Sequence, residues 1–155
     1  MRQDADRGFC ELNSCSAALL AFSQPTKWKY LHTLVVDWGL LENGTIMGVT
    51  NFLTSFRPPC LEDVTVKFVV LDGTAVFEAY EGSVYHDICR KLDQVLLEFP
   101  RRKLSFLVGC CLPPRRLLWT RELGNLFPKL RDRNNMELEC ESSELREVLC
   151  DGVQS

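Results

Sequence analysis

The alternation of apolar and polar positions is clearest between Ser83 and Phe99, where it follows the period of an α-helix. One side of this segment carries the apolar side chains, namely Val84, Tyr85, Ile88, Cys89, Leu92, Val95, Leu96 and Phe99. The opposite side is polar and consists of His86, Asp87, Arg90, Lys91, Asp93, Gln94 and Glu98. Ser83 is a suitable N-cap, and Pro100 cannot continue the helix. We therefore predict an amphipathic helix whose apolar side covers a sheet.

Four segments before this helix have the composition of strands, with many β-branched and aromatic residues: 30–41, 45–56, 64–71 and 74–80. Asn43-Gly44 separates the first two, and Asp72-Gly73 separates the last two. Both dipeptides favour the tight turns of β-hairpins because their residues tolerate a positive φ. The pattern therefore predicts two antiparallel hairpins.

The segments after the helix predict alternating strands and helices. The nearly continuous apolar run 104–112 is typical of a central strand buried on both faces. A short helix over 120–126, an edge strand over 136–140 and a last helix over 144–150 follow, while 16–22 fits either a strand or a helical turn. The fold class that we predict is α+β, with a mostly antiparallel sheet from two hairpins followed by helix, strand, helix, strand and helix.

This element order resembles that of ribonuclease H-like folds, including their exonuclease branch. In that family, acidic residues at strand ends hold metal ions. Here Asp37 is followed by Trp38-Gly39, so the expected second acidic residue is missing, and the run 104–112 ends in Cys-Cys-Leu-Pro-Pro without an acid. The resemblance therefore implies a fold that lacks its catalytic residues.

Length and composition predict one domain over 1–155, in which 1–14 is a loosely held lead-in. The first residues do not have the pattern of a secretory signal, and no apolar run approaches the roughly 20 residues that cross a bilayer. We therefore expect a cytoplasmic or nuclear protein without membrane contact. In such a compartment the eight cysteines are expected to be free thiols.

Catalytic and metal-binding patterns are weak in this sequence. There is no C-x₂-C pair, and only two histidines are present, so His86 and Cys89 would supply half of a zinc site. Cys110 and Cys111 lie in the most apolar run, where burial disfavours a reactive thiolate. We predict no catalytic residue, no metal and no cofactor.

Positive charge is concentrated between positions 101 and 133, which hold nine basic and two acidic residues in a chain of net charge −3. The candidate nucleic-acid-binding residues are Arg101, Arg102, Lys103, Arg115, Arg116 and Arg121. The alternative interpretation is that these side chains are solvated ends of a buried strand, partly neutralised by the acidic residues that follow.

Several large apolar residues near turns or on polar positions are candidates for a protein interface: Trp38, Phe52, Phe56, Leu97 and Trp119. The leading hypothesis is a non-enzymatic interaction module, a small subunit or adaptor of an intracellular hetero-complex. The alternative is a nucleic-acid-associated protein that uses the basic segment, such as an inactive ribonuclease H-like domain. A third hypothesis, a metal-dependent nuclease, depends on Asp37, Asp72, Glu78 and Asp87.

Overall fold

A computed structural model describes residues 2–4, 8–13, 28–71, 83–109 and 113–140. Their strands form one sheet in the order β1-β2-β3-β4-β5-β6. The strand bounds are β1 Arg2–Asp4, β2 Phe9–Asn13, β3 Thr33–Leu40, β4 Asp63–Leu71, β5 Arg101–Gly109 and β6 Met136–Cys140. β1 is antiparallel to β2, and every other pair is parallel. Sequence neighbours are therefore also neighbours in the sheet.

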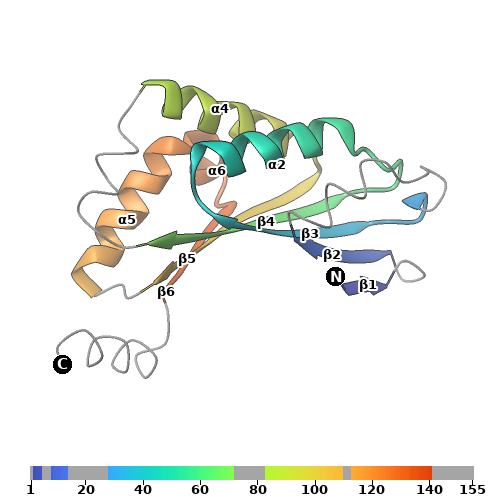
Figure 1. Cartoon of the computed structure of the whole chain (residues 1–155), viewed down its shortest axis with the longest axis horizontal. Coiled ribbons are helices and arrows are strands. Elements are labelled where there is room, and N and C mark those ends of the chain that lie inside the picture. Colours follow the sequence, from blue (N-terminus) through green and yellow to red (C-terminus); the bar gives the residue numbers. More distant parts are fainter. Residues whose placement is uncertain (1, 5–7, 14–27, 72–82, 110–112, 141–155) are drawn as a thin grey trace.

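Helices connect the parallel strands and lie on one side of the sheet. Their bounds are α2 Asn43–Ser55, α4 Ser83–Leu97, α5 Pro113–Leu126 and α6 Pro128–Asp132. Figure 1 shows α2, α4 and α6 above the strands, and α5 descending from that layer beside the strand ends at the left. Strand-helix-strand connections between parallel strands are nearly always right-handed, and in a sheet whose strands follow their sequence order this places every helix on the same face.

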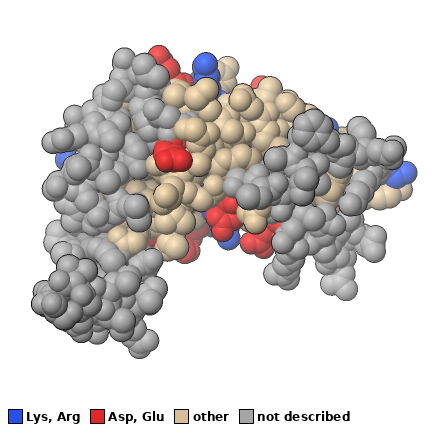
Figure 2. Space-filling view, in the orientation of Figure 1, with Lys and Arg blue, Asp and Glu red and all other residues tan. Residues whose placement is uncertain are grey.

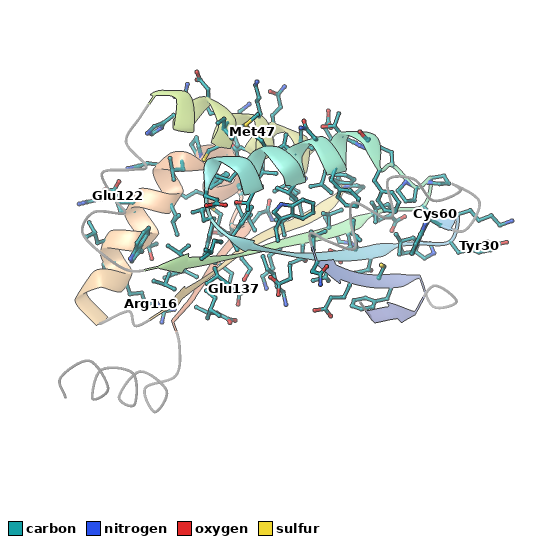
Figure 3. The ribbon with its side chains drawn as sticks, in the orientation of Figure 1. Tyr30, Met47, Cys60, Arg116, Glu122 and Glu137 are labelled. Atoms are coloured by element: carbon teal, nitrogen blue, oxygen red, sulfur yellow. The ribbon has the colours of Figure 1, made fainter. Side chains whose placement is uncertain are left out.

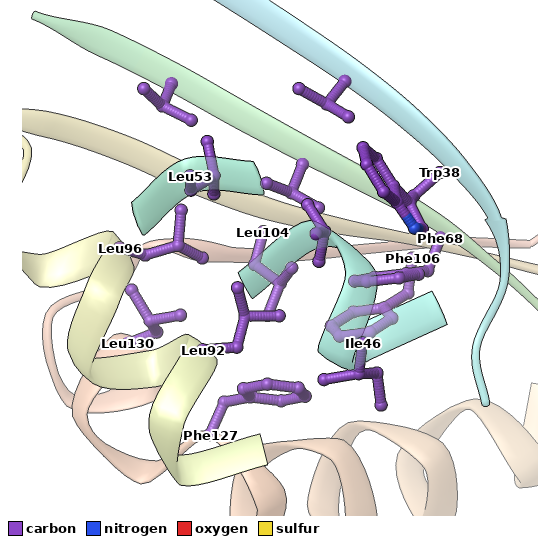
Figure 4. Packing of buried hydrophobic residues seen from close by; sticks show 14 of the residues in the cluster. Trp38, Ile46, Leu53, Phe68, Leu92, Leu96, Leu104, Phe106, Phe127 and Leu130 are labelled. Atoms are coloured by element: carbon purple, nitrogen blue, oxygen red, sulfur yellow. The ribbon is translucent and has the colours of Figure 1, made fainter. Parts of the chain in front are cut away.

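The core lies between the helices and the sheet (Figure 4). Alternate residues of the central strands are fully buried there, among them Leu34 and Val36 of β3, Val66 of β4, and Leu104 and Val108 of β5. Phe68 and Phe106 stack with ring centroids 6.1 Å apart, and Phe127 packs against Phe106 at 5.9 Å. Helix α4 contributes Cys89, Leu92 and Leu96 to this core.

The expected mostly antiparallel sheet is wrong, since β2 to β6 run parallel. The first predicted hairpin fails because Asn43-Gly44 opens helix α2 instead of a turn. The backbone N–H of Glu42 donates to Thr45 Oγ1 at 3.0 Å, which satisfies a group at the start of the helix. Ile46, Val49 and Leu53 are buried at helical spacing, so packing against the sheet selects the helix.

The order of hairpins expected for a ribonuclease H-like fold is therefore absent from the described residues. The second strand of the second hairpin, 74–80, lies outside them, as do 16–22 and the last predicted helix, 144–150. Residues 1–14, expected to be a loose lead-in, contain β1 and β2.

The central amphipathic helix and the strand over 136–140 are confirmed as α4 and β6. The predicted strand 104–112 corresponds to β5, which begins three residues earlier and lies between β4 and β6. Its expected burial on both faces is wrong, because Leu107 within the predicted run is exposed. Helix α5 is longer than the predicted 120–126, since prolines are well tolerated in the first turn of a helix.

Asp93 is one departure from the predicted helix faces, because it is buried and joins α4 to α6. Its Oδ2 accepts a hydrogen bond from the Lys129 amide at 3.2 Å, and its Oδ1 accepts one from the Leu130 amide at 3.0 Å. Burial raises the pKa of this carboxyl group, and the two amides act in the opposite direction. Asp93 thus satisfies amides at the start of α6 that have no partner within that helix.

We expect Asp93→Ala to destabilise the protein by about 1–3 kcal/mol, because two amide donors lose their acceptor. Urea unfolding followed by circular dichroism measures this change. The control is Asp87→Ala, an exposed position on the same helix that should change stability by less than about 0.5 kcal/mol. Equal stability of the two variants would contradict the structural role of Asp93.

The described thiols differ in burial, and so we expect them to differ in reactivity. Burial, with a smaller effect of the Asp93 carboxylate, raises the pKa of the Cys89 thiol to about 12. Cys60 is a free and only half-buried cysteine. Iodoacetamide at pH 8 should therefore label Cys60 in the folded protein and Cys89 only after denaturation, as measured by peptide mass spectrometry. Labelling of Cys89 as fast as that of Cys60 would argue against this packing.

Candidate open-face binding surface

The side of the sheet opposite the helices is the principal accessible surface built by the described strands. Figure 1 shows no described helix beneath β3 to β6. Because side chains alternate along a strand, the residues between the buried core positions point to this side. We call this surface the open face, and define it by Glu11, Val35, Asp37, Leu40, Thr65, Lys67, Val69, Lys103, Ser105, Leu107, Glu137 and Glu139.

One row of the open face is charged. Asp37, Lys67, Ser105 and Glu137 are register partners on β3, β4, β5 and β6. The ammonium group of Lys103 forms an ion pair with Glu137. Figure 2 shows acidic and basic side chains side by side along the lower edge of the described surface, and Figure 3 shows Glu137 on the side of the sheet away from Met47.

The neighbouring row is apolar, and a β-bulge completes it. The register of β3 and β4 shifts between Asp37 and Gly39, so that Trp38 has no register partner in β4. Gly39 has a φ of 97°, a conformation that favours glycine. After this extra residue Leu40 pairs with Val69 and points to the open face, where it is 45% exposed.

The apolar row continues across the sheet from Leu40. Val69 pairs with Leu107, and Leu107 pairs with Glu139. Leu107 is 37% exposed, although it lies in the middle of an interior strand. Adjacent strands are about 4.8 Å apart, so the three apolar side chains form one continuous row about 10 Å long. The open face therefore offers an apolar row beside a charged row.

The amino end of the basic segment is largely neutralised by acidic and polar neighbours. Arg101 lies 3.4 Å from a carboxylate oxygen of Glu62 and 4.0 Å from one of Asp63. Arg102 donates to the Asn135 side chain and to the Phe99 carbonyl oxygen, each at 3.0 Å. These contacts hold β5 against the loops around it.

The remaining candidate nucleic-acid-binding residues lie on α5, which begins after the carboxyl end of β5. Arg116 donates to the Leu138 carbonyl oxygen at 3.3 Å, and Arg121 pairs with Glu122 at 3.4 Å. The side chain of Arg115 lies outside the described residues. The structure therefore splits the six candidates into two groups, one at each end of β5.

The candidate protein-interface residues lie in or against the core. Trp119, Trp38 and Phe52 are buried, and Phe56 and Leu97 are partly buried and pack against them. Trp38 stacks near Phe52 at 5.8 Å, and Phe52 near Phe56 at 5.1 Å. The Trp38, Phe52 and Phe56 rings form one aromatic cluster, and none of the five candidates belongs to the open face.

The apolar row is not among the surfaces predicted from the sequence. Its signal was present in 101–109, where Lys103 and Ser105 alternate with Leu104 and Phe106. That alternation indicates a strand with one accessible face, and it places Leu107 on the side of the polar residues. The contribution of Leu40 depends on the bulge, which has no comparable signal in the sequence.

No group of three or more His, Cys, Asp or Glu residues that could hold a metal ion occurs in the described part of the chain. Asp37 and Asp87 of the nuclease hypothesis lie on β3 and α4, while Asp72 and Glu78 fall outside the described residues. None of the described helices is long and apolar enough to cross a membrane.

The electrostatics of the open face are most evident at Glu137. The hydrogen bond from Lys103 holds the pKa of this carboxyl group below its ordinary value, and the charge of Lys67 acts in the same direction. Both lysines are therefore close enough to act on one carboxylate at the β5–β6 side of the face.

We expect Lys103→Met to raise the pKa of Glu137 toward its ordinary value, because the main hydrogen-bond donor is lost. A carbon-13 titration of the side-chain carboxyl groups by NMR measures this shift. Lys91→Met, at an exposed position on α4, is the control and should leave the Glu137 titration unchanged. An unchanged pKa in Lys103→Met would contradict the described pairing.

Comparison of the chain with protein-family models, curated protein sequences and solved structures found no match.

Proposed function

We propose that this chain is a non-enzymatic protein-binding module, a subunit or adaptor of an intracellular complex, whose open face receives the partner. The single observation that carries this proposal is the apolar row Leu40, Val69 and Leu107 on the side of the parallel sheet opposite the helices. Parallel sheets ordinarily have both faces covered, because their crossover connections place helices on those faces. A partner that covers this side would remove the exposed leucines from water.

The composition of the open face supports a protein partner. Protein interfaces combine an apolar centre with a polar rim, and the charged row beside Leu107 provides such a rim. Leu40 and Leu107 are exposed on the same face, and the half-buried Val69 between them joins them into one row. Adjacent exposed apolar side chains mark interaction surfaces more often than isolated ones do.

The basic side chains support a nucleic-acid partner less well. Lys103 pairs with Glu137, Arg101 with Glu62 and Arg121 with Glu122. Phosphate contacts would have to displace these pairs, and acidic side chains beside them repel a polyanion. We therefore favour a protein as the partner of the open face.

The test is site-specific photo-crosslinking in extract of the cells that produce this protein. A benzophenone-bearing residue replaces Leu107 in one variant and Met47 in another. Met47 is the matched control, because it is an exposed apolar residue that lies on α2, on the other side of the sheet (Figure 3). We expect a protein adduct from position 107 that is absent from position 47.

A second pair of variants measures the contribution of the apolar row to binding. Leu107→Asp should lower recovery of the crosslinked partner by about tenfold or more, because a buried apolar contact is replaced by a charge. Met47→Asp should leave recovery unchanged, and circular dichroism checks that both variants fold. An RNA adduct at position 107, or equal adducts at both positions, would overturn the proposal.

A further inference from the structure

Acidic side chains flank the apolar row on both sides. Asp37 precedes Leu40 on β3, with the bulge between them, and Glu139 ends the row on β6 as the register partner of Leu107. Neither carboxylate forms an ion pair with a side chain of the described residues, although Glu139 shares a side-chain hydrogen bond with Glu137. Both lie on exposed positions.

The other charges nearby form no ion pair with these two among the described residues, although Lys67 is the register partner of Asp37. Glu137 has a partner in Lys103. Lys67 is the single basic residue in the described rows from Asp37 to Glu139, and its charge also acts on Glu137. The half of the open face around the apolar row is therefore acidic at its two sides and apolar between them.

We infer that the open face binds a protein segment with an apolar stripe that is bounded at both ends by Lys or Arg. This inference rests on the proposed function and specifies the chemistry of the partner. Asp37 and Glu139 are three strand spacings apart across the sheet and one row apart along the strands, which together give about 16 Å. In an amphipathic helix lying across the strands, about nine to eleven residues span that distance.

Charge complementarity decides the sign of the flanking residues. An apolar segment with acidic flanks would place like charges beside Asp37 and Glu139, which is unfavourable once water is excluded. A basic segment forms opposite-charge pairs at both ends and leaves its leucines over Val69 and Leu107. The pairs select the partner, and the apolar row supplies most of the buried area.

The test uses three synthetic helical peptides of equal length. One has a leucine stripe with lysines at both ends, the second has glutamates in place of the lysines, and the third keeps the lysines with alanines in place of the leucines. Binding to the full chain is measured by fluorescence anisotropy at physiological salt. Amide shifts of Leu40, Val69 and Leu107 in nitrogen-15 NMR spectra locate the site.

We expect the leucine-lysine peptide to bind about tenfold more tightly than either of the others. Asp37→Lys combined with Glu139→Lys should reverse the preference toward the glutamate peptide. The matched control combines Asp87→Lys with Asp132→Lys, two exposed positions away from the open face, and should retain the preference of the unmodified chain.

Equal binding of the lysine and glutamate peptides, an unchanged preference in the open-face double variant, or equally tight binding of the alanine peptide would overturn this inference. A protein adduct at position 107 together with any of these results would reject only the basic-partner chemistry. Absence of a specific adduct at position 107 would reject the proposed function as well.

Discussion

Burial of one face of a parallel sheet beneath a single layer of helices is the interaction on which the rest of this structure depends. Val66 and Phe68 of β4 and Leu104 and Phe106 of β5 lie beneath that layer and are almost completely removed from water. Such burial contributes on the order of 1.5–3 kcal/mol for each large apolar side chain. The helices therefore cannot be separated from the sheet without loss of the core.

The same packing places buried polar groups beside hydrogen-bond partners. Without those partners, their burial would cost free energy of folding. The buried side chain of Asp93 in α4 accepts hydrogen bonds from two backbone amides at the start of α6. These bonds offset the cost of burying the carboxyl group and the amides. Just after the carboxyl end of α4, Arg57 pairs with Glu98 and lies over the Phe99 ring at 4.7 Å. These contacts join neighbouring connections, so that the helices act as one layer.

The open face is the consequence of placing all helices on one side. Each strand then has apolar side chains on the side of the helices and a mixture of polar and apolar side chains on the open face. The mixed side chains of neighbouring strands lie in register. The bulge in β3 changes this pattern at one point, because one extra residue returns Leu40 to the open side. A local backbone irregularity thereby extends the apolar row of β4 and β5 to β3.

The sequence by itself determined which segments are regular where apolar spacing is long or strict. The helix α4 and the strand β6 follow directly from such spacing, and much of β5 does as well. Strand direction was not determined, since parallel and antiparallel strands have the same two-residue period. Asn43-Gly44 favours a turn locally, yet burial of Ile46 and Val49 against the sheet favours a helix.

Only the tertiary structure decided that β2 to β6 run parallel, that the helices share one side, and that Leu40, Val69 and Leu107 meet on the other. These features depend on contacts between residues far apart in the chain, and local periodicity contains no information about them.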